Sequence, residues 1–332
     1  MAVRVWDGDT DTDWATAANW TGDALPVADD EVVFDSRQVT KPTTGMTDGG
    51  VGHSGKDTAC TFDLLHFKEG YTGGIGTAAL PCICSPDTII IEGTGTYHIN
   101  VGKNDQSTNT TVGKVIINNS SATVYLYSNC NDGANVAEFT DVYLLAGTLY
   151  LAFYSADTDD QGCSVANLYV MPKNNKASNT TVIIEKDAYD VLNSQATNIY
   201  MANGTLTTDS QVGTFHIYNG IVNYGTDLGG SPEADLNITL LVMHGGMFNW
   251  YPDDSGTPTI TTAWLFGKSR FLADATTNDD RAKTITTIYT FGGSIFNIDN
   301  NKANITITNW YDYGAAITIG SHGKLALTYD QP

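Results

Sequence analysis

Residues 215–224 read Phe-His-Ile-Tyr-Asn-Gly-Ile-Val-Asn-Tyr, in which two short alternating segments meet at a glycine. Alternation of inward apolar and outward polar side chains is typical of β-strands that bury one face. Residues 241–250, Leu-Val-Met-His-Gly-Gly-Met-Phe-Asn-Trp, repeat this arrangement around Gly246. Similar units recur from about residue 112 onward, so the sequence indicates an all-β protein built from repeats.

The spacing of the repeats predicts their packing. The last five bend glycines are 26, 21, 26 and 21 residues apart: Gly220, Gly246, Gly267, Gly293 and Gly314. This distance is the length of one coil in a solenoid. A single coil buries too little apolar surface to offset the entropy of ordering it, whereas stacked coils share a ladder and a core. We therefore expect a single-stranded β-solenoid, also called a parallel β-helix, over residues 111–332.

An antiparallel β-sandwich array is the alternative fold. In that case each bend glycine would occupy the turn of a hairpin. The dipeptides Asn203-Gly204 and Asn219-Gly220 favour it locally, because Asn-Gly is a common hairpin turn. The regular spacing favours the solenoid.

Composition and charge narrow the possible partners. Lys and Arg number 16 against 37 Asp and Glu, which gives a formal net charge of −21. Such a surface repels phosphate backbones and anionic lipid, so we expect neither nucleic-acid nor membrane binding. The chain has no apolar run long enough for a membrane helix, and its first residues do not resemble a signal peptide.

Residues 1–110 differ from the repeats that follow. They contain three closely spaced tryptophans and two glycine clusters. Pro81 and Pro86 mark two breaks in this part of the chain. We interpret this region as a cap or attachment region in which the first coils form from Thr88 onward. Its cap residues are expected to be three indoles and a phenylalanine that cover the open end of the solenoid: Trp6, Trp14, Trp20 and Phe34.

The same N-terminal segment carries a resemblance to known proteins. Residues 5–26 read Val-Trp-Asp-Gly-Asp-Thr-Asp-Thr-Asp-Trp-Ala-Thr-Ala-Ala-Asn-Trp-Thr-Gly-Asp-Ala-Leu-Pro, and residues 30–34 read Asp-Glu-Val-Val-Phe. This pattern resembles the opening module of autotransporter-type passenger proteins and of related β-helical surface and virion proteins. The resemblance implies an architecture and no particular chemistry.

A β-helical surface protein without a secretion signal or membrane barrel resembles a bacteriophage virion component made in the host cytoplasm. The compact size is similar to that of a head decoration, or cement, protein. The resemblance implies a non-enzymatic homotrimer on the virion surface that binds the major capsid protein or other virion proteins. Two alternatives stay open: a tail spike or fibre that binds, and in some cases cleaves, host glycans, and a bacterial surface adhesin.

Few residues suggest a site. Asp7, Asp9, Asp11 and Asp13 alternate like calcium ligands, although an EF-hand would need glycine and glutamate where Thr12 and Ala18 stand. We expect no other cofactor.

Aromatic side chains near the bends are candidates for glycan or subunit contacts, namely Tyr218, Trp250, Trp264 and Trp310. For a glycan depolymerase, Asp253 with Asp254 and Asp279 with Asp280 are the acid pairs to consider.

Overall fold

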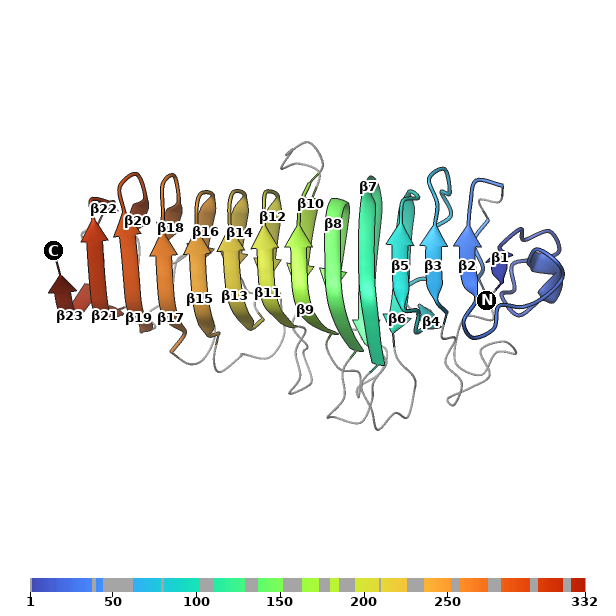
Figure 1. Ribbon diagram of the computed structural model, residues 1–332, viewed down its shortest axis with the longest axis horizontal. Coiled ribbons are helices and arrows are strands. Elements are labelled where there is room, and N and C mark those ends of the chain that lie inside the picture. The colour runs from blue at the N-terminus through green and yellow to red at the C-terminus, as the bar shows by residue number, and fades with distance from the viewer. Residues whose placement is uncertain are drawn as a thin grey trace. The chain divides into compact units, whose positions relative to one another are not determined.

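The structure is a computed structural model that describes most of the chain (Figure 1). The described residues are 2–37, 40–43, 62–78, 81–101, 110–128, 137–151, 163–172, 180–184, 195–208, 210–225, 236–251, 257–273, 282–298, 304–318 and 324–331. The chain divides into two compact units. Unit 1 comprises residues 1–166 and 189–194, and unit 2 comprises residues 167–188 and 195–332.

Unit 1 consists of β-strands, of which β7 and β8 are the longest, and one turn of 3-10 helix. The elements are β1 (Val3–Val5), η1 (Ala17–Asn19), β2 (Glu31–Phe34), β3 (Leu64–Phe67), β4 (Cys82–Cys84), β5 (Thr88–Ile91), β6 (Gly95–Val101), β7 (Thr110–Ser128) and β8 (Ala137–Leu151). Strand β9 (Cys163–Val170) begins in unit 1 and ends in unit 2.

The strands of unit 1 pair in parallel with those of the next coil. Val32 of β2 lies beside Leu65 of β3, which lies beside Ile89 of β5. This ladder starts with β1 beside β2 and continues from β5 to β7 and β8. A second ladder joins β4, β6 and β7. Because each ladder is made of successive coils, unit 1 is a β-solenoid.

Unit 2 is built in the same way from pairs of strands joined by tight bends. Its strands are β10 (Thr180–Ile184), β11 (Gln195–Met201), β12 (Thr205–Thr208), β13 (Val212–Ile217), β14 (Ile221–Tyr224), β15 (Ile238–Met243), β16 (Met247–Trp250), β17 (Thr259–Leu265), β18 (Arg270–Leu272), β19 (Lys283–Phe291), β20 (Ile295–Asn297), β21 (Asn304–Tyr313), β22 (Ala316–Thr318) and β23 (Lys324–Gln331).

Two parallel ladders run through unit 2 (Figure 1). One joins the odd-numbered strands from β11 to β23, and the other joins the even-numbered strands from β10 to β22. The predicted β-solenoid is therefore confirmed, and the antiparallel array is wrong. The Asn-Gly pairs at 203–204 and 219–220 turn the chain between the two ladders instead of closing hairpins.

The solenoid begins earlier than the sequence suggested. Thr88 was expected to open the first coils, but β1, β2 and β3 already pair in parallel. The repeat signal was hidden because the short apolar strands at Glu31–Phe34 and Leu64–Phe67 are separated by a glycine-rich stretch. The sequence suggested a boundary at residue 110, but strands on both sides of it pair in parallel, because β5 and β6 lie beside β7.

The bend glycines adopt the conformation that their positions predict. The φ angle of Gly246 is +77°, in the left-handed region that side chains other than glycine rarely adopt. A Cβ atom on Gly246 would lie 2.7 Å from the carbonyl oxygen of Gly220 in the preceding coil. Glycine is therefore required by the backbone angle and by the closeness of the stacked bends.

The interior of each unit is a column of apolar side chains contributed by alternating strand positions. In unit 2 the rings of Phe248, Phe271 and Phe296 stack in successive coils, with centroids 5.6 and 5.3 Å apart. Trp250 and Trp310 pack against this column. Among the described residues no helix is long and apolar enough to span a membrane.

Candidate functional site

The N-terminal aromatic residues form a buried cluster in unit 1. Trp20 packs edge-on against Trp6 and Trp14, with ring centroids 5.1 and 4.6 Å apart. Both Trp6 and Trp14 also contact Phe34 of β2, whose ring stacks on Phe67 of the next coil. We call Trp6, Trp14, Trp20 and Phe34 the aromatic cap. Its rings lie at the start of the ladder of unit 1, as their spacing suggested.

Hydrogen bonds fix the orientation of these indoles. The Nε1–H of Trp6 donates to the carbonyl of Thr40 at 2.8 Å, and that of Trp20 donates to the carbonyl of Trp14 at 2.9 Å. The buried ring N–H groups of Trp6 and Trp20 are therefore satisfied, which keeps the burial of these two large side chains favourable. The aromatic cap is a structural element with its polar groups used internally.

The alternating aspartates are not gathered around one point as the ligands of a single ion would be. Asn19 is buried, and its amide donates to Asp11 Oδ1 at 2.6 Å and to the carbonyl of Asp13 at 2.9 Å. Asp13 in turn caps the N–H of Ala15. Within the described part of the chain, no three His, Cys, Asp or Glu side chains gather to hold a metal ion. Asp7, Asp9, Asp11 and Asp13 thus belong to a loop in which Asn19 is the centre of the hydrogen bonds.

Outside the core of unit 2, aromatic rings form a column on the surface. The rings of Tyr218, His244, Phe266, Phe291 and Tyr313 stack in consecutive coils, with centroids 4.6–5.3 Å apart and interplanar angles of 9–17°. Each of these residues directly precedes the bend of its coil. We call these five residues the outer column. Tyr218 and Tyr313, its end members, are each 54% exposed.

A second stack lies next to the outer column. Trp264 and Tyr289 stack at 3.9 Å, and Tyr289 and Tyr311 stack at 4.8 Å. Trp264 also approaches Phe266 and Phe291 of the outer column, with ring centroids 6.0 and 6.2 Å apart. Face-to-face stacking covers the flat faces of the inner rings, so most of the aromatic surface that faces solvent consists of ring edges.

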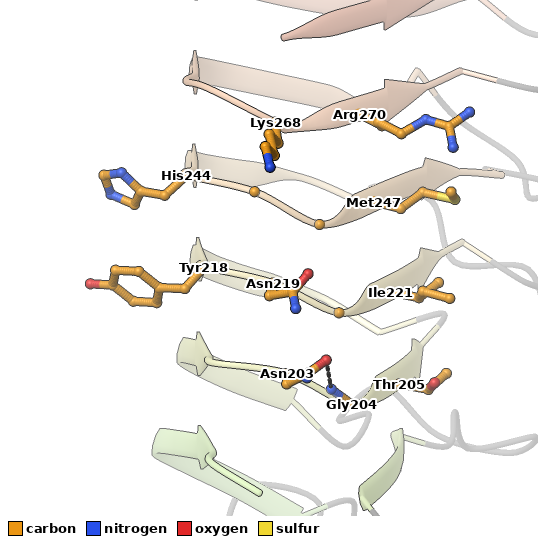
Figure 2. Close-up of a pocket in the computed structure, with 13 residues that line it drawn as sticks. Asn203, Gly204, Thr205, Tyr218, Asn219, Ile221, His244, Met247, Lys268 and Arg270 are labelled. Atoms are coloured by element: carbon orange, nitrogen blue, oxygen red, sulfur yellow. Dashed lines mark hydrogen bonds between the residues drawn. The ribbon is translucent and has the colours of Figure 1, made fainter. Parts of the chain in front are cut away.

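The bends beside the outer column line an open groove with a volume of about 770 Å³ (Figure 2). Tyr218 and His244 point away from the bends on one side, and Ile221 and Met247 extend on the other. Glycine backbone forms the floor between these two rows. A Cβ atom on Gly220 or on Gly246 would lie 2.7 Å from a backbone carbonyl oxygen of the preceding coil, so both of these lining positions require glycine.

A change in bend length brings a cation to the groove. Two residues separate His244 from Met247, as in the preceding coil, whereas three residues separate Phe266 from Arg270. The longer bend is a turn in which the N–H of Ser269 donates to the carbonyl of Phe266 at 3.1 Å. Lys268 is the extra residue, and it lies over the bend between the two rows of side chains (Figure 2).

The charge of this groove is opposite to that of the whole chain. Lys268 and Arg270 line it and are exposed, and none of its described lining residues is Asp or Glu. The ion pairs found in the described ranges join Arg4 to Asp30, Arg37 to Asp35 and His66 to Glu92, so neither groove cation takes part in one. Two cations that form no ion pair with the described residues, on a chain of net charge −21, are a local feature that suits an anionic group.

Of the four aromatic contact residues that the sequence suggested, two face solvent and two do not. Tyr218 lies at the groove, and Trp264 is half-buried in the second stack. Trp250 is 0% exposed and Trp310 is 4% exposed, so the prediction of a surface contact is wrong for both. The strand register explains this result, because the inward positions of β16 and β21 carry these indoles.

Some surface residues escaped the sequence analysis although a signal was present. Phe266 and Phe291 occupy the same position before a bend as Tyr218, and Lys268 and Arg270 flank the longer bend. Aligning the repeats on the bend glycines would have placed them together. The acid pairs 253–254 and 279–280 lie outside the described residues.

One histidine on the same face has a pKa below its ordinary value. Burial lowers the pKa of the His216 imidazole, and the positive charge that His244 can carry lowers it further. His216 stacks on Tyr200 with centroids 5.1 Å apart, so it serves as a flat ring in a stack.

Comparison with known proteins adds nothing to this geometry. No protein-family model matches the sequence, and neither the curated proteins nor the solved structures contain a match. The site must therefore be interpreted from its own residues.

Proposed function

We propose that the chain is a non-enzymatic structural protein of a virion surface, a head decoration protein that docks on the shell. The observation that carries this proposal is the outer column, which extends over five consecutive coils of unit 2. Contiguous aromatic surface on a rigid support is typical of protein contact sites. The parallel ladder supplies that support, because each coil holds its ring at the same place relative to the next.

The aromatic cap supports the same proposal. A solenoid end that is left open exposes unpaired strand edges and invites association with other chains. Burial of three indoles at the start of unit 1 protects that end, which suits a protein that remains folded on a particle. The resemblance of this segment to modules of β-helical surface and virion proteins adds to this support. Partners in this proposal are the major capsid protein and two further copies of the chain.

The test is the copy number of the chain in purified particles of the virus that encodes it, measured by quantitative mass spectrometry. A decoration protein is expected on the order of hundreds of copies per particle, because it follows the symmetry of the shell. A few to tens of copies would contradict decoration and support the spike or fibre alternative. Absence from particles would contradict both virion roles and leave the surface adhesin.

A further inference from the structure

The groove of unit 2 combines three features that belong to different residues. It has an exposed aromatic ring, Tyr218, at one edge, a floor of glycine backbone, and two exposed cations, Lys268 and Arg270, on the coil with the longer bend (Figure 2). The amide of Asn219, also exposed in the bend, adds hydrogen-bonding capacity. An aromatic platform, amide groups and cations together suit a ligand that has flat apolar faces, hydroxyls and carboxylates.

Tyr218, an end member of the outer column, differs from the inner rings in one respect. His244 stacks on one of its faces, with centroids 5.1 Å apart. In the preceding coil the position next to Tyr218 is occupied by Ala202, because Met201 pairs with Ile217. One face of the Tyr218 ring therefore lacks an aromatic neighbour, and a sugar ring can pack against it. The inner rings of the column present only edges.

The cations define the chemical class of the ligand. Lys268 and Arg270 have no carboxylate partner among the described residues, and the groove contributes none. The net charge of −21 repels polyanions at long range, but at physiological ionic strength charges more than about 8 Å apart are largely screened. Two local cations can therefore bind carboxylates, while a nucleic acid would need a longer basic stripe.

We propose that this groove binds an acidic polysaccharide. Its carboxylates pair with Lys268 and Arg270, and one of its sugar rings packs on the free face of Tyr218. The open shape of the groove suits a polymer that passes through it. This binding activity goes beyond docking on a shell and does not depend on it, because the groove is complete within unit 2.

The experiment is a calorimetric titration of the full chain with polygalacturonate oligomers at physiological ionic strength. The matched probe is the same oligomer with its carboxyl groups methyl-esterified. We expect the acid form to bind roughly tenfold or more tightly than the ester, because charge-assisted hydrogen bonds are lost on esterification. No binding of the acid form, or equal binding of both forms, would overturn the proposal.

Two double variants locate the site. Lys268→Ala with Arg270→Ala is expected to weaken binding roughly tenfold or more. The control, Lys68→Ala with Lys114→Ala, removes two exposed cations from unit 1 and should leave binding unchanged. Equal loss in both variants would mean a general charge effect and overturn the site. All four residues are exposed, and circular dichroism checks that the variants fold.

Two further measurements decide the ligand class. Tyr218→Ala is expected to weaken binding of the acid oligomer several-fold while leaving the fold intact. Binding of a single-stranded oligonucleotide as tight as that of polygalacturonate would overturn the polysaccharide assignment. Because all these titrations use the isolated chain, failure here is distinguishable from failure of the virion proposal, which is decided by copy number in particles.

Discussion

The aromatic cap of unit 1 and the outer column of unit 2 use the same kind of side chain in opposite ways. In the cap, three indoles meet edge-on and are buried, and those of Trp6 and Trp20 donate their N–H groups to backbone carbonyls. In the outer column, rings stack face to face on the surface, and its end members Tyr218 and Tyr313 are more than half exposed.

The difference shows which aromatic residues stabilise the fold and which are available for binding. Irregular loops can bring rings that are distant in sequence together at any angle. The cap rings therefore pack edge to face and cover the hydrophobic interior at the start of unit 1. A parallel ladder places equivalent residues directly above one another, so outward rings can only stack. We infer that removal of cap rings affects stability, whereas removal of column rings affects binding.

The largest expected effect is at the centre of the cap. Trp14→Ala should lower the free energy of unfolding of unit 1 by about 3–5 kcal/mol, because it removes a fully buried indole and leaves a cavity. Urea unfolding and hydrogen exchange of residues 3–34 measure the loss. Tyr218→Ala is the control, with an expected cost of about 1 kcal/mol or less. Equal costs for the two variants would contradict the distinction between cap and column.

The bends provide the next largest effect. Gly246→Ala should cost about 2–4 kcal/mol, because its φ is +77° and its new Cβ would meet the carbonyl of Gly220. Gly314 has a φ of +90° and nothing within 4 Å of its Cβ position, so Gly314→Ala should cost only about 1–2 kcal/mol. Urea unfolding of both variants measures the difference. If Gly314→Ala were the more costly, close stacking of the bends in the groove would be excluded.

A smaller, pH-dependent effect is expected beside the cap. Asp30 is buried and accepts hydrogen bonds from the N–H groups of Ala2, at 2.7 Å, and Val27, at 3.2 Å. Burial alone would raise the pKa of Asp30, but these bonds and the Arg4 guanidinium hold it below the ordinary value of 3.8. Asp30→Asn should cost about 1–3 kcal/mol near neutral pH, because the amide cannot accept all of these bonds.

The sign of the pH dependence follows from the lowered pKa of Asp30. The carboxylate contributes its full stabilisation above pH 3.8 and loses it as the pH falls through the folded-state pKa. The difference between the natural chain and Asp30→Asn should therefore be constant from neutral pH down to about 5, and then shrink in acid. Urea unfolding at several pH values measures it. A difference that grows in acid would rule out a charged Asp30.

Much of the fold was predictable from the sequence because the repeat carries two independent signals. Alternation of apolar residues predicts strands, and the distance between Gly220, Gly246 and the later bend glycines predicts coils. The early coils were missed, because Glu31–Phe34 and Leu64–Phe67 are short and lack the bend glycine. Local spacing does not reveal pairing between strands that lie so far apart in sequence.

The site was less predictable than the fold. The sequence offers Tyr218, Trp250, Trp264 and Trp310 alike as contact candidates because they lie near bends, but Trp250 and Trp310 occupy inward positions. A shift of one residue changes the face that a strand residue occupies, and composition does not reveal it. The groove depends on the extra residue in the bend at Lys268, whose effect appears only when neighbouring coils are stacked.

The most direct test of the stacked coils is a cysteine pair on two adjacent coils along one side of the groove. Ile221→Cys and Met247→Cys occupy paired positions of β14 and β16. Parallel neighbours lie roughly 4.8 Å apart, within the Cα range of a disulfide, whereas strands two coils apart lie roughly 9.6 Å apart. The control pair is therefore Ile221→Cys with Arg270→Cys, with Cys60 and Cys130 changed to serine in both proteins. After mild oxidation, we predict by mass spectrometry a 221–247 disulfide and no 221–270 disulfide. A chain that forms the 221–270 bond, or fails to form the 221–247 bond, would contradict the stacked-coil account.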